Sequence, residues 1–556
     1  MATHAPPDTR MLHAHDVVVA PATASAGAEA HRASRAKLAA WLGLGALTLA
    51  AAMVFWAFDA LPFQDLPAHA GLIALRHHVS DWASEHRYYV VAPHLGPYSL
   101  FRFLGEVFLV PFGPVGAVRA IATLPVVATP LALLWARRRL HGDRSPTAGY
   151  FGLALSFGFM TLLGFASYLL GVAVMLVALT MWLELLVAVD TGDVAAARRR
   201  EIAIACFAPF VFVAHGHAFV IFLALAGVSA LATGRRWPRL LRLRALAPGL
   251  ALAAWDAWRE RASVLPAGSV APSNPALEPH FQGAYDKFSL LVTPTLMTRT
   301  GLDALVGLGL WVTLAACVVA TARALRRPPA QPPAPAQLAS TLHTRALLAC
   351  IAALGVVFLA LPHSIGWFGF VDGRLVPLLL LLAVMAVRRE ALGHTLGTIH
   401  DRFATVAASA MIAIALVASH SFQNEARGWR EVLAQVPAGA RLLNLPLEPN
   451  SDVFTAHPFI HYDKLVLTER PIVVSDVWFH QGSAVYPTAA NPALHLPASY
   501  SESNLRFIDW PAYRLSDWDY VLIRTRPEAG QPYVPPGLEL AIHRGGWWLF
   551  RSHPAG

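Results

Sequence analysis

Long apolar runs alternate with short polar segments over most of the chain. The first run begins near Leu38 and has about 21 residues, enough for a helix to cross the hydrocarbon core of a bilayer. Ten more runs follow, several of them shorter, at 115–136, 147–164, 166–188, 202–215, 217–233, 243–258, 302–322, 346–362, 375–387 and 403–419. The pattern predicts a mainly α, polytopic transmembrane helix bundle with about 11 spans.

The two ends of the chain lack this pattern. Residues 1–34 are rich in Ala, Pro, Thr and His and have no apolar period, which predicts a disordered cytoplasmic tail. Residues 35–420 then form the transmembrane domain, with a long first outer loop at 59–114. Residues 421–556 hold short apolar stretches separated by turn residues, which predict a soluble extracytoplasmic α/β domain.

Within this C-terminal domain, six apolar stretches have the length and composition of β-strands. They lie at 441–446, 465–467, 471–475, 520–524, 538–542 and 547–551. The segment 429–436 predicts a helix.

Composition supports a membrane protein. Of 556 residues, 56% are hydrophobic and only 14% are charged, whereas soluble proteins have roughly 25% charged residues. This excludes a soluble enzyme, a disordered chain and a disulfide-stapled secreted domain. The three cysteines, Cys206, Cys317 and Cys350, all fall in apolar segments and are expected to be small buried hydrophobes.

The positive charges predict how the chain is oriented. Lys and Arg outnumber Asp and Glu by 43 to 34, a net charge of +9. The basic residues form short clusters between apolar runs, at 32–37, 137–139, 198–200, 235–239, 326–327 and 388–389. Because Lys and Arg concentrate in cytoplasmic loops, this spacing places the N-terminus in the cytoplasm and the C-terminal domain outside. We expect a bacterial-type inner (plasma) membrane protein that binds the lipid bilayer and no nucleic acid.

One short segment does not fit the count of spans. Residues 98–113 are apolar but carry Arg102 and Glu106. We interpret them as an amphipathic helix in the outer membrane interface. If they cross the membrane instead, the total is twelve and the orientation of the following loops reverses.

Asp65 is the first candidate for chemistry, because it follows the first span and precedes a predicted helix with Pro67 in its first turn. It is compatible with a helix N-cap, and equally with a partly desolvated catalytic base at the outer mouth of the bundle. His69 lies four residues later on the same helix face. The two side chains are able to orient each other or to contribute to a divalent metal site, although two ligands are a weak metal signal.

Two further groups of polar residues lie near the outer ends of spans. His215 and His217 flank Gly216 in a turn, where they either satisfy local backbone groups or face a cavity. Asp372 and Arg374 occupy the last outer loop, where the guanidinium is able to hold a phosphate, to snorkel or to pair with Asp372.

Residues of the first outer loop join these candidates. Arg102 raises the same question of phosphate binding, and His94 is a candidate for lining the same mouth or for a turn. The chain has no P-loop, GxSxG, HExxH or CxxC pattern in a suitable context. ATP-driven transport and serine hydrolysis are therefore unsupported.

Four features of this layout resemble the GT-C class of integral membrane glycosyltransferases, which includes protein O-mannosyltransferases and lipid A aminoarabinose transferases. They are Asp65 in a long loop directly after span one, the segment 98–113, the span that runs from Arg119 to the basic cluster at 137–139, and an outer α/β domain. Many members of the class carry a second acid in the next outer loop. Here that turn reads Leu-Gly-Phe-Ala-Ser-Tyr at 163–168, without a carboxylate.

The resemblance implies transfer of a sugar on the outer face from a polyprenyl-phosphate-linked donor to an envelope glycan, lipid or protein. It also implies that Asp65 is the catalytic base or a metal-linked acid. The substrate-binding candidates are then His69, His94, Arg102, His215, His217, Asp372 and Arg374. The alternatives are a non-catalytic membrane scaffold or glycan-binding protein, favoured by the aromatic-rich C-terminal domain, and a secondary transporter, which we rank last.

Overall fold

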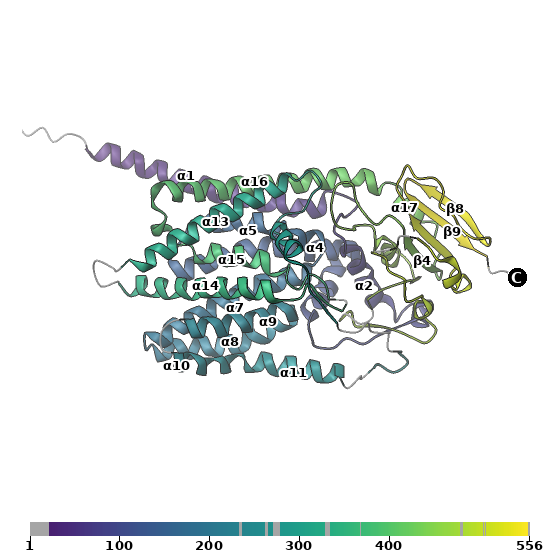
Figure 1. Cartoon of the computed structure of the whole chain (residues 1–556), viewed down its shortest axis with the longest axis horizontal. Coiled ribbons are helices and arrows are strands. Elements are labelled where there is room, and N and C mark those ends of the chain that lie inside the picture. The colour runs from purple at the N-terminus through teal and green to yellow at the C-terminus, as the bar shows by residue number, and fades with distance from the viewer. Residues whose placement is uncertain are drawn as a thin grey trace, which may run out of the picture.

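A helical bundle forms one end of the molecule and a β-sheet forms the other (Figure 1). The computed structural model describes residues 22–553, apart from 233–235, 262–264, 271–277, 328–333, 367, 479–481, 504 and 506. The larger part of the predicted tail, residues 1–21, lies outside this description.

Within the described residues, each of the eleven apolar runs overlaps a helix. The helices on these runs are α1 (Ala22–Trp56), α4 (Ser99–His141), α5 (Thr147–Ser156), α6 (Phe159–Leu162), α7 (Ala166–Asp190), α8 (Val194–Ala214), α9 (Gly216–Ala232), α11 (Ala247–Arg261), α13 (Leu302–Arg326), α14 (Pro335–Ala360), α15 (Leu375–Ala386) and α16 (Gly393–Ala426). Six helices in this part of the chain are long and apolar enough to cross a membrane, namely α4, α7, α13, α14, α16 and residues 34–56 of α1. The integral membrane character is thereby supported, and the number of spans stays a prediction.

Helix α1 begins earlier than predicted, at Ala22 rather than near the first apolar run. Residues 22–34 were expected to belong to a disordered tail, so this part of the prediction is wrong. The segment is rich in Ala, the strongest helix former, and it continues without a break into the apolar helix, which removes the cost of nucleation.

The segment 98–113 is helical, as predicted, but it is joined to the following span as one element, α4. The helix is interrupted at Gly113, whose φ of +68° and ψ of 177° lie outside the helical region. Before this break, Arg102 and Gly105 are buried, whereas Phe103 and Val110 are 64% and 86% exposed. This segment therefore presents one apolar face outward, in agreement with an amphipathic helix.

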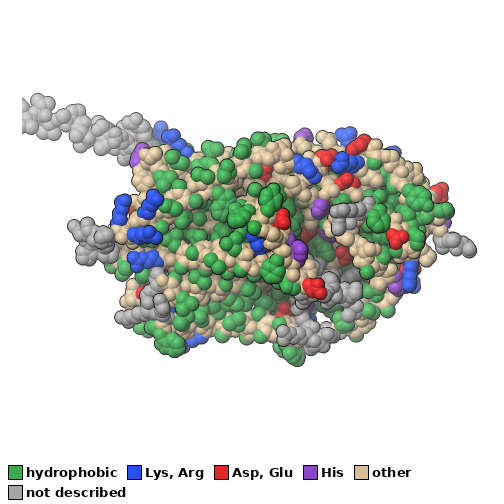
Figure 2. Space-filling view, viewed as in Figure 1, with side chains coloured by type: hydrophobic (Ala, Val, Ile, Leu, Met, Phe, Trp, Pro, Cys, Tyr) green, Lys and Arg blue, Asp and Glu red, His purple; other side chains and the backbone are tan. Residues whose placement is uncertain are grey.

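Lys and Arg side chains gather at the end of the bundle opposite the sheet (Figure 2). Arg138 in the last turn of α4, Arg199 near the start of α8 and Arg389 just before α16 are all exposed. The charge pattern that predicted the orientation thus corresponds to one end of the molecule, and the sheet lies at the other end (Figures 1 and 2).

The C-terminal region contains a five-stranded sheet of order β5-β4-β7-β9-β8. Its strands are β4 (Arg441–Pro446), β5 (Val473–Val474), β7 (Tyr520–Arg524), β8 (Leu538–Arg544) and β9 (Trp547–Ser552). Strand β4 is parallel to β5 and β7, and β9 is antiparallel to β7 and β8. Five of the six predicted strands are confirmed, and the predicted helix begins at Trp429 as α17 (Trp429–Leu433).

The sixth predicted strand, 465–467, is wrong: it forms part of a 3₁₀ helix, η4 (Tyr462–Thr468). This segment packs against α2 (Leu66–His78), where a Cβ on Gly71 would meet the Lys464 carbonyl oxygen at 2.7 Å. Because its apolar side chains are buried against a helix, the segment does not join the sheet.

The first outer segment and the C-terminal region are tied together. Besides α2, this segment holds α3 (Ala83–His86) and β1 (Tyr89–Val91), and β1 pairs antiparallel with β6 (Val485–Pro487). Smaller elements are α10 (Arg236–Leu240), α12 (Ala284–Ser289), β2 (Pro279–His280) and β3 (Ser364–Ile365). How the chain divides into domains stays a prediction, but the outer segment and the C-terminal region share one packed structure.

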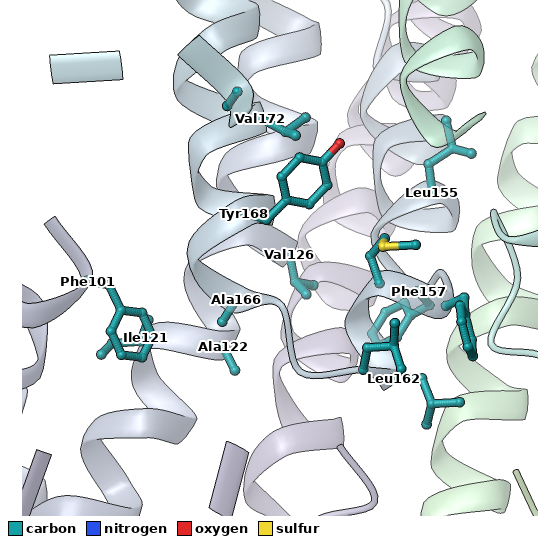
Figure 3. Close-up of a cluster of buried hydrophobic side chains, with 14 of the residues drawn as sticks. Phe101, Ile121, Ala122, Val126, Leu155, Phe157, Leu162, Ala166, Tyr168 and Val172 are labelled. Carbon is teal, nitrogen blue, oxygen red and sulfur yellow. The ribbon is translucent and has the colours of Figure 1, made fainter. Parts of the chain in front are cut away.

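Below this junction, apolar side chains of α4, α5, α6 and α7 form a continuous core (Figure 3). Phe101, Phe157 and Tyr168 are at most 4% exposed there. This packing fixes the helix ends on which the polar side chains described next are placed.

Candidate functional site

A cavity of about 1950 Å³ lies between the helix ends and the C-terminal region. Five of the eight predicted site residues line it: Asp65, His69, Arg102, His215 and Arg374. They come from α2, α4 and the turns before α9 and α15, so the fold brings together residues that are far apart in sequence.

Asp65 occupies the N-cap position of α2, but its side chain makes no capping hydrogen bond. Its carboxylate accepts a hydrogen bond from the side-chain amide of Gln64 at 3.4 Å, and its Oδ1 lies 3.8 Å from His461 Nε2. Burial raises the pKa of Asp65 to about 6, although His461, Gln64 and Arg374 oppose the shift. The carboxylate is therefore available to the cavity and has the properties of a general base near neutral pH.

The backbone around Asp65 is held by the turn that precedes α7. The amides of Gln64 and Asp65 donate to the carbonyls of Leu162 and Leu163 at 2.9 and 3.2 Å. Gly164, with a φ of +78°, allows this approach, since a Cβ there would lie 2.8 Å from the Asp65 nitrogen. This is the same turn in which the sequence lacks a second acid.

His69 packs its ring against Phe101 and Trp478, with centroid distances of 4.5 and 5.2 Å. Burial and the nearby Arg76 lower the pKa of His69 to about 3, so the ring is neutral. Among the described residues, no group of three His, Cys, Asp or Glu side chains is arranged to hold a metal ion. The geometry therefore assigns His69 to the wall of the cavity.

Arg374 is 5% exposed and stacks against aromatic rings. Its guanidinium carbon lies 4.6 Å from the Phe165 centroid and 4.1 Å from that of Phe368. Tyr168 donates to the Arg374 carbonyl at 2.7 Å, which fixes the start of α15. One guanidinium nitrogen donates to the Gly369 carbonyl at 3.1 Å, and the buried Nε has no hydrogen-bond partner in the described part of the chain. A stacked cation with a free donor is suited to an anionic group.

The other arginines of the cavity differ in how many donors they have free. Arg102 donates to the carbonyls of His94 and Gly482 and to Ser99 Oγ, so its guanidinium links the start of α4 to the C-terminal region. Arg76, from α2, also lines the cavity, and its buried Nη2 has no hydrogen-bond partner within the described residues. Arg76 therefore keeps this unpaired buried donor, although its Nε lies 3.8 Å from the Glu106 carboxylate, whereas Arg102, the arginine expected from the sequence, is engaged by carbonyls and Ser99.

The two histidines of the His-Gly-His turn have different surroundings. His215 is 2% exposed, its Nδ1 accepts from the His217 backbone amide at 3.2 Å, and its ring lies edge-on to Tyr98 and Tyr168. It thus both satisfies a local backbone group and lines the cavity. His217 packs against Tyr168 and Phe368 and lies behind the cavity wall.

His94 and Asp372 lie outside the lining of the cavity. The His94 ring faces Asp256 of α11 at 3.9 Å. Asp372 is fully buried and pairs with Lys287 at 2.6 Å and His363 at 2.9 Å, not with Arg374 as one interpretation had it. Asp372 therefore anchors the loop that leads to Arg374, where it also accepts from the Gly373 amide at 2.7 Å.

The C-terminal region also contains a buried charged cluster that was not predicted from the sequence. Glu502 accepts from Lys464 Nζ at 2.5 and 2.6 Å and lies 2.9 Å from His461 Nδ1. Asp463 lies 3.1 Å from Lys464. His461 and Glu502 both line the cavity. The sequence does contain an indication of this cluster, a polar run at 461–464 inside an otherwise apolar stretch. The run was not identified as a site because the neighbouring residues 465–467 were predicted to form a strand.

Solved structures give an independent comparison. Over 92% of this chain and 97% of its own, the structure of ArnT from Cupriavidus metallidurans bound to undecaprenyl phosphate matches with a TM-score of 0.52 at 12% identity. The chain shares the fold of ArnT. The resemblance to GT-C glycosyltransferases expected from the sequence is confirmed at the level of fold.

Other comparisons are more distant. Two structures of the arabinofuranosyltransferase AftD from Mycobacteria match 92% of this chain but 40% and 41% of theirs, with TM-scores of 0.47 and 0.41 at 15% and 14% identity. No family model matches the sequence, and no curated protein matches it.

Proposed function

We propose that the chain is a membrane glycosyltransferase that moves a sugar from a polyprenyl-phosphate-linked donor to an acceptor of the cell envelope. The observation that carries the proposal is the presence of Asp65 and Arg374 at one large cavity, next to apolar walls formed by helix ends. The ArnT structure, which shares the fold, is bound to undecaprenyl phosphate.

In this proposal, Asp65 acts on the acceptor and Arg374 acts on the leaving phosphate, on opposite sides of the anomeric carbon. The Asp65 carboxylate accepts the proton of an acceptor hydroxyl or amine, whose oxygen or nitrogen forms the new bond to the anomeric carbon. The bond from that carbon to the phosphate oxygen breaks, and polyprenyl phosphate leaves as an anion. Arg374, with Arg76, stabilises the negative charge on the phosphate. The transfer inverts the anomeric configuration.

The charge distribution supports an orientation for this reaction. The Lys- and Arg-rich end of the bundle is cytoplasmic by the positive-inside rule, and the cavity with the sheet lies on the outer face. The N-terminus is then cytoplasmic, in a bacterial-type inner membrane.

The alternative of a glycan-binding scaffold receives less support. Of the aromatic residues that suggested it, Trp510, Trp518, Trp547 and Trp548 are at most 8% exposed and belong to the packed interior around the sheet. Trp478 lines the cavity instead of an open surface.

The experiment that tests the proposal is Asp65→Asn, assayed for consumption of undecaprenyl-phosphate-linked sugars by protein in vesicles. We expect turnover to fall at least about 100-fold, while binding of undecaprenyl phosphate persists. Asp59→Asn is the matched control, since Asp59 belongs to the same segment and its side chain is 78% exposed. Unchanged turnover in Asp65→Asn would refute the proposal.

The phosphate role of Arg374 has its own test. We expect Arg374→Gln to weaken binding of undecaprenyl phosphate by about 10-fold or more. Arg374→Lys should restore only part of this affinity, because an ammonium group neither stacks on the aromatic rings nor offers two parallel donors as a guanidinium does. Arg87→Gln, at an exposed arginine of the first outer segment, is the control. Equal affinity in all variants would exclude Arg374 as the phosphate ligand.

A further inference from the structure

The His461 ring lies between two carboxylates that come from distant parts of the chain. Its Nδ1 is 2.9 Å from Glu502 Oε2, and its Nε2 is 3.8 Å from Asp65 Oδ1. The ring is 5% exposed and packs edge-on to Trp478 at a centroid distance of 5.0 Å. The ring is thereby held with one nitrogen toward each acid.

Glu502 is fixed in the ionised form by its other partners. Lys464, Asn444 and the Tyr500 hydroxyl donate to it, at 2.5 to 3.0 Å. Lys464 and His461 hold the pKa of Glu502 at about 2 despite its burial. An ionised carboxylate at this position accepts a hydrogen bond from Nδ1–H of His461. The other ring nitrogen, Nε2, is then the one that faces Asp65.

We propose that His461, anchored by Glu502, is a positioning residue that keeps Asp65 in its carboxylate form. A proton on Nε2 faces Asp65 Oδ1 and offsets the cost of holding that negative charge away from water. This inference rests on the proposed role of Asp65 as the base, and it adds a residue from the C-terminal region to the site.

Other polar and charged groups lie near this pair. Around Asp65 they are Gln64, which is neutral, and Arg374. Around His461 they are Glu502, Lys464 and the neutral His69 of α2. Arg374 and Lys464 keep their charge throughout the range in which Asp65 titrates. The pH dependence near pH 6 therefore reports on Asp65.

The test is the pH profile of kcat/KM for His461→Gln, which keeps a polar side chain but removes the charge. We expect the acidic limb to move up by about 1 pH unit. Activity then falls about fivefold at pH 6 and returns nearly to the wild-type value at pH 8. Glu502→Gln, which leaves the ring in place, should move the limb in the same direction by less.

The control is His553→Gln, because His553 and Glu539 form a similar imidazole–carboxylate pair at 2.9 Å on the exposed part of the sheet. It should leave the profile unchanged. A purely structural role for His461 predicts lower activity at every pH with an unmoved midpoint, and this result would overturn the inference. Where His461→Gln does not fold, His461→Asn and Glu502→Gln decide the question. If Asp65→Asn abolishes turnover while these profiles do not move, only this inference fails and the proposed function stands.

Discussion

Replacing Gly164 by Ala tests the placement of Asp65 without touching its side chain. Gly164 has a φ of +78°, and its neighbours Leu162 and Leu163 accept the backbone hydrogen bonds of Gln64 and Asp65. A Cβ at Gly164 would lie 2.8 Å from the Asp65 nitrogen, whereas ordinary van der Waals contact begins at 3.4 Å. The backbone of Asp65 must therefore move by about 0.6 Å.

The size of the effect follows from this displacement. A shift of about 1 Å in a reacting group costs on the order of 100-fold in rate. We therefore expect Gly164→Ala to lower kcat/KM by about 10- to 100-fold, which corresponds to about 1.4–2.7 kcal/mol. The left-handed backbone adds a cost of about 1–2 kcal/mol to folding, which has nothing to do with Asp65.

Gly192 separates these two costs. It lies in the turn between α7 and α8, has a φ of +74°, and a Cβ there would meet no atom within 4 Å. Gly192→Ala therefore has the same backbone strain without a collision. Consumption of undecaprenyl-phosphate-linked sugar and thermal unfolding are measured for both variants. Similar unfolding temperatures and a loss of turnover in Gly164→Ala alone are expected; equal turnover in the two variants would refute the reasoning.

Three further predictions concern the charges around the site. Since burial raises the pKa of Asp65 to about 6 and a base must be ionised, kcat/KM should be constant above this pH and fall about tenfold per unit below it; a flat profile down to pH 4 would contradict the assignment. Lys464→Met leaves Asp463 and Glu502 buried without their cation and should lower the free energy of unfolding by about 3–5 kcal/mol, as measured by denaturant titration. Lys287→Met removes the partner of Asp372 and should weaken undecaprenyl phosphate binding severalfold through the loop before Arg374; unchanged affinity would show that this loop is held by other contacts.

The helical part of the fold was accessible from sequence because each apolar run has a single physical requirement. A segment that faces lipid must satisfy its backbone hydrogen bonds internally, so it must be a helix wherever it occurs. The strands of the sheet were visible for a similar reason, since β4 and β7 are almost wholly buried and rich in Leu, Val and Ile. The segment 465–467 has the same composition, and only its packing on α2 distinguishes it.

The candidate site was accessible in part. Asp65 and Arg374 stood out because charged residues at the ends of apolar segments are costly and therefore informative. His461 and Glu502 did not stand out, since neither follows a long apolar run, and their meaning comes from contacts that link distant parts of the chain. The pairing of β1 with β6, strands of three residues each, is likewise too short to leave a pattern.

The turn at 163–168, which has no acid, contacts the backbone of Asp65. A Cβ at Gly164 would lie 2.8 Å from the Asp65 nitrogen, and the turn contributes carbonyl groups to the Asp65 backbone instead of a carboxylate. The group that faces the Asp65 side chain is an imidazole from the C-terminal region, at 3.8 Å. The Asp65 carboxylate is consequently set among cationic and neutral partners, which favours its ionised form. Because one partner comes from the bundle and another from the C-terminal region, the surroundings of Asp65 depend on both regions.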